Sequence, residues 1–224
     1  MFVAMYCVVT AGPTYEPLDD VRRLTNFSTG RLGSELATFL SSHGHEVRLL
    51  LGQQASYRSE FQKAQIDTFT TTNDLRDRLR ALSATPIDAI FHTAAVSDFG
   101  FGKVWLRSAQ GELTEIKSGK ISTRQGTLLA ELVPTPKIIM EVRDWFPKAY
   151  LIGWKYEVDG DRNSVLALAQ NQISDCRTDI CVANGPAYGP GFGLVTRQNG
   201  YIHVPDTQKL FAGLEALLIQ TTSH

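Results

Sequence analysis

The chain has 224 residues, of which 43% are hydrophobic and 20% charged, as is ordinary for a globular protein with a full core. Its formal net charge of −1 excludes a global basic field for holding nucleic acid or an anionic membrane, so we expect neither partner. No apolar run reaches the roughly 18 residues of a membrane helix. The three cysteines, Cys7, Cys176 and Cys181, show no CxxC spacing, so we expect free thiols and a cytoplasmic location.

Short apolar runs alternate along the chain with amphipathic stretches, which predicts a mostly parallel sheet flanked by helices. The predicted strands cover residues 3–10, 46–51, 66–70, 87–93, 149–155 and 179–183. The predicted helices cover 30–44, 72–84, 134–146 and 161–174, with a last one from near Asp206. A late β-hairpin is predicted over 192–204, with "QNG" as its turn. We therefore expect one three-layer, Rossmann-like α/β domain over residues 1–224.

Residues 99–126 do not fit this alternation. They are rich in glycine and polar residues and have no helical period. Because a connection of this length inside a compact domain is usually functional or disordered, we expect an irregular, flexible arm at the active site.

The first predicted strand ends in "VTAGPTYEP". In a doubly wound fold this first turn lies at the carboxyl edge of the sheet, where ligands bind. Gly12 lets the backbone approach a ligand, and Thr10 and Thr14 offer hydroxyl groups. The stretch lacks the GxGxxG fingerprint of dinucleotide-binding proteins, so a simple tight turn is the alternative interpretation.

The stretch "TNFSTGRLG", residues 25–33, precedes a helix. Ser28 or Thr29 can cap that helix, and Gly30 leaves its first amides uncovered, which favours binding of a phosphate. Asn26 can donate and accept hydrogen bonds together. Positive charge comes from Arg22, Arg23 and Arg31. The alternative is a capped helix with solvated arginines.

Two further stretches carry candidate side chains. In "HTAAVSDFG", the small Ala94 and Ala95 would allow close approach of a ring or backbone, and Asp98 could hold Mg²⁺ or merely cap a turn. In "KSGKIST", Lys120 lies on a glycine-bearing segment from which an ammonium group could stabilise transition-state charge. Solvation is the alternative for this lysine.

Taken together, these stretches resemble the phosphopantothenate–cysteine ligases, also called phosphopantothenoylcysteine synthetases, of the monofunctional type. Six motifs occur in order: "TAGPTYEPLDDVRRLTNFSTGRLG", "AAVSDF", "KIST", "LVPTPKI", "GWK" and "DICVAN". The resemblance covers most of the chain. It implies no flavin, because the flavin-binding half of the fused bifunctional proteins has no room in this chain.

The resemblance implies that 4′-phosphopantothenate and L-cysteine are joined through an acyl-nucleotide, in coenzyme A biosynthesis, with CTP or ATP and Mg²⁺. It implies that Asn26 contacts the acyl phosphate, Arg22 helps to fix the substrate and Lys120 serves turnover of the intermediate. Asp98 would lie by the nucleotide and its metal. A homodimer is also implied, with residues 99–126 as the dimerisation arm. The implied nucleotide-binding residues are Gly12, Thr14, Ser28, Thr29, Gly30, Ala94, Ala95, Asp98, Phe99, Lys120, Trp154 and Lys155.

Three features depart from the family pattern. Pro13 replaces the second glycine of the first loop, and Gly185 stands where an aspartate usually follows "VAN". The fourth predicted helix and its end lack the usual lysines and carry Gln170, Gln172 and Arg177. These departures motivate an alternative, a non-catalytic nucleotide-binding regulator of the same fold. A nicotinamide-dependent oxidoreductase is a further alternative, disfavoured because GxGxxG and a Tyr-x-x-x-Lys pair are both missing.

Overall fold

The structure, a computed structural model, describes residues 4–57, 64–116, 119–122, 126–198 and 200–221. Its centre is an eight-stranded sheet in the order β13-β12-β11-β10-β6-β1-β4-β5. The parallel strands are β1 (Tyr6–Ala11), β4 (Glu46–Gly52), β5 (Gln65–Phe69), β6 (Ala89–His92), β10 (Tyr150–Tyr156) and β11 (Ile180–Asn184). Numbered along the chain, these six lie in the order 3-2-1-4-5-6 of doubly wound nucleotide-binding folds, with the direction of winding reversing between β1 and β6.

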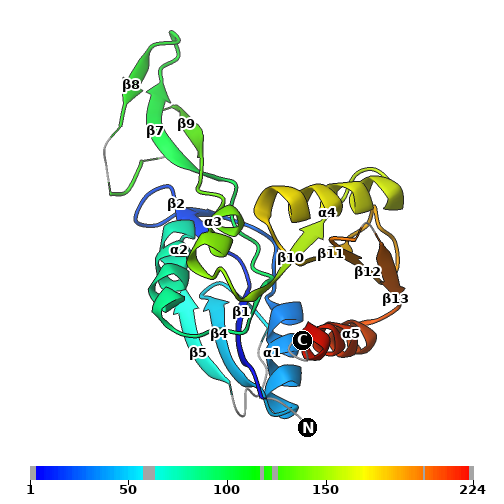
Figure 1. The fold of residues 1–224 in the computed structure, drawn as a ribbon. Helices are drawn as coiled ribbons and strands as arrows, with labels where there is room; N and C mark the ends of the chain where they lie inside the picture. Colours follow the sequence, from blue (N-terminus) through cyan, green and yellow to red (C-terminus); the bar gives the residue numbers. More distant parts are fainter. Residues whose placement is uncertain (1–3, 58–63, 117–118, 123–125, 199, 222–224) are drawn as a thin grey trace.

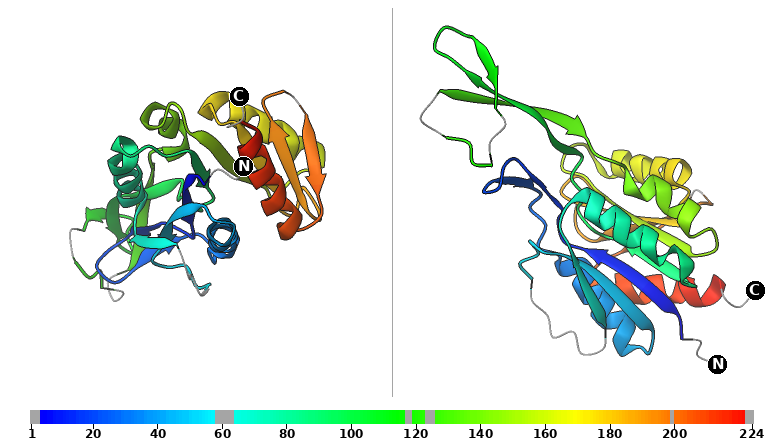
Figure 2. Two further views of the ribbon diagram at one scale, coloured as in Figure 1. Left: turned by 60° about the horizontal axis from the view of Figure 1, so that its bottom comes forward. Right: turned by 90° about the vertical axis from the view of Figure 1, so that its left-hand side faces the viewer.

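Helices cover both faces of the sheet, so the molecule has three layers (Figures 1 and 2). On one face lie α1 (Arg31–Ser42) and α5 (Thr207–Thr221), which enclose the largest apolar cluster with alternate residues of the strands. On the other face lie α2 (Thr72–Ala81), α3 (Ile138–Trp145) and α4 (Arg162–Cys176). A short 3₁₀ helix, Leu82–Ala84, follows α2. The predicted fold class is confirmed.

The helix ends follow from local chemistry. Thr71 precedes α2, and its hydroxyl accepts a hydrogen bond from the Asp74 amide at 3.2 Å. Asp161 forms a reciprocal capping box with Ser164 at the start of α4. Gly44, at φ 93°, follows the end of α1 in the left-handed conformation that a helix stop favours. Helix α3 begins at Ile138, later than predicted, because Pro134 still pairs with Phe99 in a strand.

The six predicted parallel strands are all present, each displaced by at most a few residues; residue 3 lies outside the described residues. The predicted hairpin is also present, as β12 (Phe192–Thr196) and β13 (Tyr201–Val204), which extend the sheet in antiparallel fashion. All three cysteines are buried and free. Burial raises the pKa of Cys7 and of Cys181 to about 12, so both behave as inert core thiols.

The expectation of an irregular segment at 99–126 was wrong for most of the part that the structure describes, although residues 119–122 belong to no helix or strand. Its residues form strands β7 (Phe99–Arg107) and β8 (Leu113–Glu115), which join β9 (Thr127–Pro134) in a separate antiparallel sheet. We call these three strands the arm; they project from the edge where the parallel strands end (Figure 1). A short hairpin of β2 (Tyr15–Pro17) and β3 (Arg23–Thr25) lies at the same edge. Within the described ranges, no helix is long and apolar enough to cross a membrane.

Candidate functional site

The first loop and the start of α1 meet in a contact that only glycines allow. Gly12 and Gly30 have φ of 82° and 78°, and a Cβ on either would lie 3.0 Å or less from the Ala55 Cβ. Gly30 is the residue that precedes α1, and no side chain in the described structure caps the first turn. The Thr29 hydroxyl accepts only from the Arg31 amide, at 3.3 Å. Apart from the Arg31 amide, the first amides of α1 have no side-chain partner among the described residues and could bind an anion, as expected from Gly30, although neither Ser28 nor Thr29 is the capping residue.

Thr14 lies inside the protein, not at its surface. Its fully buried hydroxyl accepts a hydrogen bond from the Ser97 amide at 2.8 Å, donates to the Ser97 hydroxyl at 3.1 Å and lies 3.3 Å from the Thr72 hydroxyl. The backbone adds two more bonds, from the Thr14 amide to the Ala95 carbonyl and from the Ala95 amide to the Gly12 carbonyl. Thr14 therefore joins the loops that follow β1 and β6.

Asn26 lies over the second of these loops. Its side-chain amide donates to the carbonyl oxygens of Ala95 and Val96, both at 3.2 Å. The β2–β3 hairpin delivers Asn26 to this position, and the neighbouring Phe27 is fully exposed. The structure thus brings Asn26, Ala95 and the start of α1 together at the point where the winding of the sheet reverses, as the sequence predicts.

Arg22 contacts protein groups from two parts of the chain. Its guanidinium donates to the Asp19 carboxylate at 2.5 and 3.1 Å and to the Ile121 carbonyl at 2.7 Å. These bonds, together with three backbone amides, hold the pKa of Asp19 well below its usual range. Lys120, the residue before Ile121, is exposed beside this junction.

Asp98 and Phe99 lie where the β6 loop enters the arm. Asp98 forms an exposed ion pair with Lys137, the Nζ–Oδ1 distance being 3.2 Å, and Phe99 is 47% exposed. Among the described residues, no cluster of three or more His, Cys, Asp and Glu side chains could hold a metal ion. A single carboxylate nevertheless fits Mg²⁺ that is held mainly by phosphate oxygens and water.

Trp154 and Lys155 lie near the end of β10, on the neighbouring strand beyond β6. The half-buried Trp154 ring packs against the α1 face of the core, and its Nε1 has no hydrogen-bond partner among the described atoms. The Lys155 ammonium lies 2.8 Å from a carboxylate oxygen of Glu157. These two predicted residues therefore line the same carboxyl edge as Asn26.

Two functional-site neighbours were missed in the sequence. Glu16, in β2, is buried and accepts a hydrogen bond from the Thr72 amide at 2.9 Å, which ties the hairpin to the start of α2. His92 ends β6, where burial lowers its pKa to about 4 and its Nδ1 lies 3.0 Å from the Thr10 hydroxyl. A titratable residue at the end of an apolar run is the signal that could have indicated His92, whereas Glu16 stands in the polar stretch "TYEPLDD" and gives no such signal.

The residues at the three departures from the family pattern each have distinct backbone or side-chain contacts. Pro13 forms a parallel bridge with Ala95. Gly185 has φ of 113°, and a Cβ there would lie 2.8 Å from the Glu157 backbone nitrogen, so an aspartate does not fit this backbone. The Gln172 side chain lies over Gly153 of β10, where a Cβ would collide with its Nε2.

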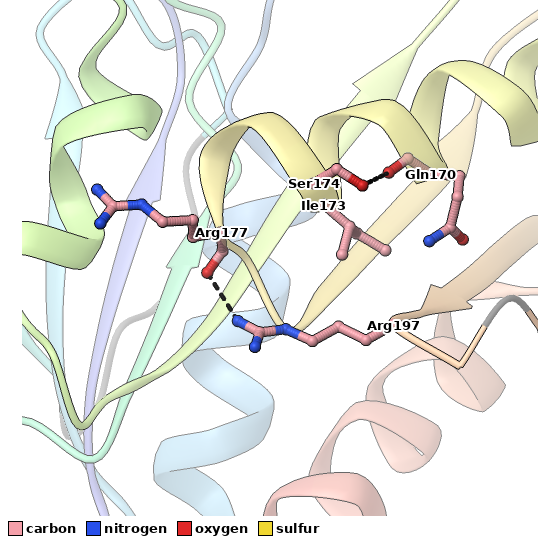
Figure 3. A pocket seen from close by; sticks show the side chains of 5 residues that line it. All are labelled: Gln170, Ile173, Ser174, Arg177 and Arg197. Carbon is pink, nitrogen blue, oxygen red and sulfur yellow. Dashed lines mark hydrogen bonds between the residues drawn. The ribbon is translucent and has the colours of Figure 1, made fainter.

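A hollow elsewhere on the surface is separate from this site. It has a volume of about 300 Å³ and lies at the C-terminal end of α4 (Figure 3). Its two arginines are paired with carboxylates, Arg177 with Asp144 at 2.8 Å and Arg197 with Asp179 at 3.1 Å. The lining residues are Gln170, Ile173, Ser174, Arg177 and Arg197.

Comparison with known proteins places these features in context. The family model described as DNA/pantothenate metabolism flavoprotein C-terminal domain matches residues 4–211. The coenzyme A biosynthesis bifunctional protein CoaBC of Thermococcus kodakarensis is 33% identical over 177 residues, which are 79% of this chain and 40% of that protein. Mouse phosphopantothenate–cysteine ligase is 26% identical over 79% of this chain and 71% of its own length. The crystal structure of the DNA/pantothenate metabolism flavoprotein from Streptococcus pneumoniae superposes with a TM-score of 0.82 at 26% identity, covering 99% of this chain and 100% of that one. The chain spans less than half the length of the CoaBC proteins that it matches.

Proposed function

The chain belongs to the DNA/pantothenate metabolism flavoprotein C-terminal domain family, and on this premise we propose that it is a phosphopantothenate–cysteine ligase. Family membership confirms the resemblance that the six motifs indicate. The observation that carries the proposal is that Asn26 lies at the same edge of the sheet as the start of α1, which no side chain of the described residues caps. The segment bearing Lys120 is hydrogen-bonded to the loop of the β2–β3 hairpin that precedes Asn26. The mouse relative is itself named a phosphopantothenate–cysteine ligase, which supports this assignment.

The proposed reaction has two displacements. A carboxylate oxygen of 4′-phosphopantothenate attacks the α-phosphorus of CTP or ATP, and pyrophosphate leaves. The cysteine amine then attacks the acyl carbon, loses a proton, and the nucleoside monophosphate leaves. Both steps depend on holding reactants in place and stabilising negative charge, so no strongly nucleophilic side chain is required.

The residues of this edge fit those needs. The amides at the start of α1 suit a phosphate group, and the Asn26 side chain, bound over the loop that follows β6, would contact the acyl phosphate. The ammonium of Lys120 would stabilise charge on the phosphate as it leaves. Ala94 and Ala95 have small side chains, so a ligand could approach the backbone closely there. Trp154 and Lys155 would border the nucleotide.

Asp98 is the residue that would hold Mg²⁺. A bound Mg²⁺ would neutralise phosphate charge and orient the leaving pyrophosphate. Lys137, now paired with Asp98 at 3.2 Å, would then be released toward the same phosphates. The free, buried cysteines fit a reducing compartment, so we place the reaction in the cytoplasm.

We also propose that the chain acts as a homodimer through the arm. Large apolar side chains are exposed on the arm and on or next to the β2–β3 hairpin; they include Val21, Leu24, Phe27, Phe99, Leu113, Leu129, Leu132 and Val133, each at least 36% exposed. An exposed apolar surface of this kind marks an interface. Sedimentation should give twice the chain mass for the native protein and the monomer mass for Leu132→Asp. Ile202→Asp, a matched exposed site on β13, should leave the dimer intact.

The activity is tested by release of pyrophosphate from CTP or ATP that depends on phosphopantothenate. Lys120→Gln should release pyrophosphate but accumulate the acyl-nucleotide, which mass spectrometry of quenched reactions would detect. Lys103→Gln, which alters an exposed lysine of β7, is the matched control and should turn over normally. Nucleotide binding without pyrophosphate release would refute the ligase and support the regulator.

A further inference from the structure

The segment that carries Lys120 is fastened to the loop of the β2–β3 hairpin. The Ile121 amide donates to the Asp19 carboxylate at 3.2 Å, and the Ile121 carbonyl accepts from the Arg22 guanidinium at 2.7 Å. On the other side of Lys120, the Gly119 carbonyl accepts from the Asp20 amide at 2.9 Å. Three hydrogen bonds therefore hold the two neighbours of Lys120 against residues 19–22, which lie about 100 positions earlier in the chain.

Asp19 is the centre of this junction. Its side chain is fully buried, and its two oxygens accept from the amides of Val21, Arg22 and Ile121 and from the Arg22 guanidinium. A carboxylate with these donors stays ionised, and Arg22 compensates its charge. The Arg22 Nη2 group donates to both Asp19 and the Ile121 carbonyl, and Nε adds a second bond to Asp19, so one guanidinium joins the two segments.

The Ile121 side chain anchors the segment further. It is 5% exposed, whereas Gly119 and Lys120, which precede it, are exposed. The Ile121 side chain is buried, and its backbone amide and carbonyl are both hydrogen-bonded. The backbone of the preceding residue, Lys120, therefore has little conformational freedom. The position of the Lys120 backbone is consequently fixed by residues of the hairpin.

We propose that Asp19 is a positioning residue, which through Arg22 and the Ile121 backbone sets where Lys120 lies in the site. The catalytic part of this proposal rests on the proposed function, since it needs Lys120 to act on a phosphate. Arg22 then serves the reaction by holding the Lys120 segment. The β2–β3 hairpin, which positions Asn26, also positions Lys120. One short element thereby aligns two groups that approach the same phosphate from different parts of the chain.

Amide hydrogen exchange at Ile121, read by NMR, tests the junction without any activity. In the native protein this amide should be protected, and Asp19→Asn should speed its exchange by about tenfold or more, because a hydrogen bond to a charged group is lost. Arg22→Met should do the same, because it removes every side-chain donor that joins Asp19 to the Ile121 carbonyl. Asp67→Asn, which breaks the comparable Arg48–Asp67 pair on β5, is the control and should leave Ile121 unchanged. Unchanged exchange in both junction variants would overturn the proposal.

A double-mutant cycle tests the consequence for catalysis. Asp19→Asn should slow the amine step by about tenfold or more in the native background, with little change in the KM for the nucleotide. In a Lys120→Gln background the same change should alter that step less than about twofold, because the side chain being positioned is absent. Equal effects in both backgrounds would show a general structural role and overturn the proposal. Absence of pyrophosphate release from the native protein would instead refute the proposed function, while Ile121 exchange would still decide the junction.

Discussion

His92 should make the stability of the protein depend on pH. The ring ends β6 between Thr10 of β1 and Gly153 of β10, and burial lowers its pKa to about 4. The Ala94 amide donates to the Thr10 hydroxyl at 3.2 Å, and His92 Nδ1 lies 3.0 Å from the same oxygen, so a ring with Nδ1 unprotonated can accept from this hydroxyl. The neutral ring accepts that bond, whereas a protonated ring would present a second donor to it.

The size and sign of the effect follow from the two protonation constants. The unfolded chain takes up a proton near pH 6.5, whereas the folded chain does so near pH 4. Between these values the unfolded state binds more protons, so the free energy of unfolding falls as the pH falls and levels out below about pH 4. A difference of about 2.5 pKa units corresponds to a loss of about 3 kcal/mol.

Urea unfolding measured at several values between pH 7.5 and pH 4 tests this, with His92→Asn as the control. An asparagine amide can meet the Thr10 hydroxyl but does not titrate. Other titrating groups are common to both proteins, so the difference in their free energies of unfolding isolates His92. That difference should change by about 3 kcal/mol across the range. A difference that stays constant with pH would refute the buried, neutral histidine.

Three further substitutions test the candidate site. Gly33→Ala should lower the free energy of unfolding by about 1–3 kcal/mol in urea titrations, because the new methyl group would overlap the Thr93 hydroxyl; an unchanged midpoint would contradict this packing. Gly185→Asp should lower the melting temperature by several degrees, since φ is 113° and Glu157 blocks the Cβ; normal melting would refute the requirement for glycine. Asn26→Asp should reduce steady-state turnover about a hundredfold with the fold intact, because a carboxylate would face backbone carbonyls and a phosphate; unchanged turnover would remove Asn26 from the site.

The central sheet could be predicted because its inner strands β1, β4, β6 and β11 are buried on both faces and are therefore nearly continuous apolar runs. The arm could not be predicted in the same way. Of the nine residues of β7 only Gly100 and Val104 are buried, and a bulge between Phe101 and Val104 breaks the alternation. Main-chain hydrogen bonds to β8 and β9 hold this strand. Such bonds do not depend on side-chain type, so the order of apolar and polar residues does not predict them.

The candidate site was predictable where backbone conformation decides it. Gly12 and Gly30 were identified from their places after a strand and before a helix, and both have the positive φ that glycine permits. The surroundings of Arg22 were not predictable, because its partner Ile121 lies 99 residues away and bonds through its backbone. Thr14 was expected to face a ligand, yet its hydroxyl is used within the protein, which depends on the paired loop at Ser97.

The bridge between Pro13 and Ala95 has a consequence for how this loop can vary. In a parallel bridge the bonds are made by the residues that flank one partner, here the Gly12 carbonyl and the Thr14 amide, and the amide of residue 13 is not used. A ring at residue 13 therefore leaves both bonds in place. Because proline restricts the unfolded chain more than glycine does, it lowers the entropy lost on folding. Residue 13 can therefore be substituted without loss of these two hydrogen bonds, and a proline there stiffens the chain. Gly12 and Thr14 remain constrained, because their backbone groups make the bonds.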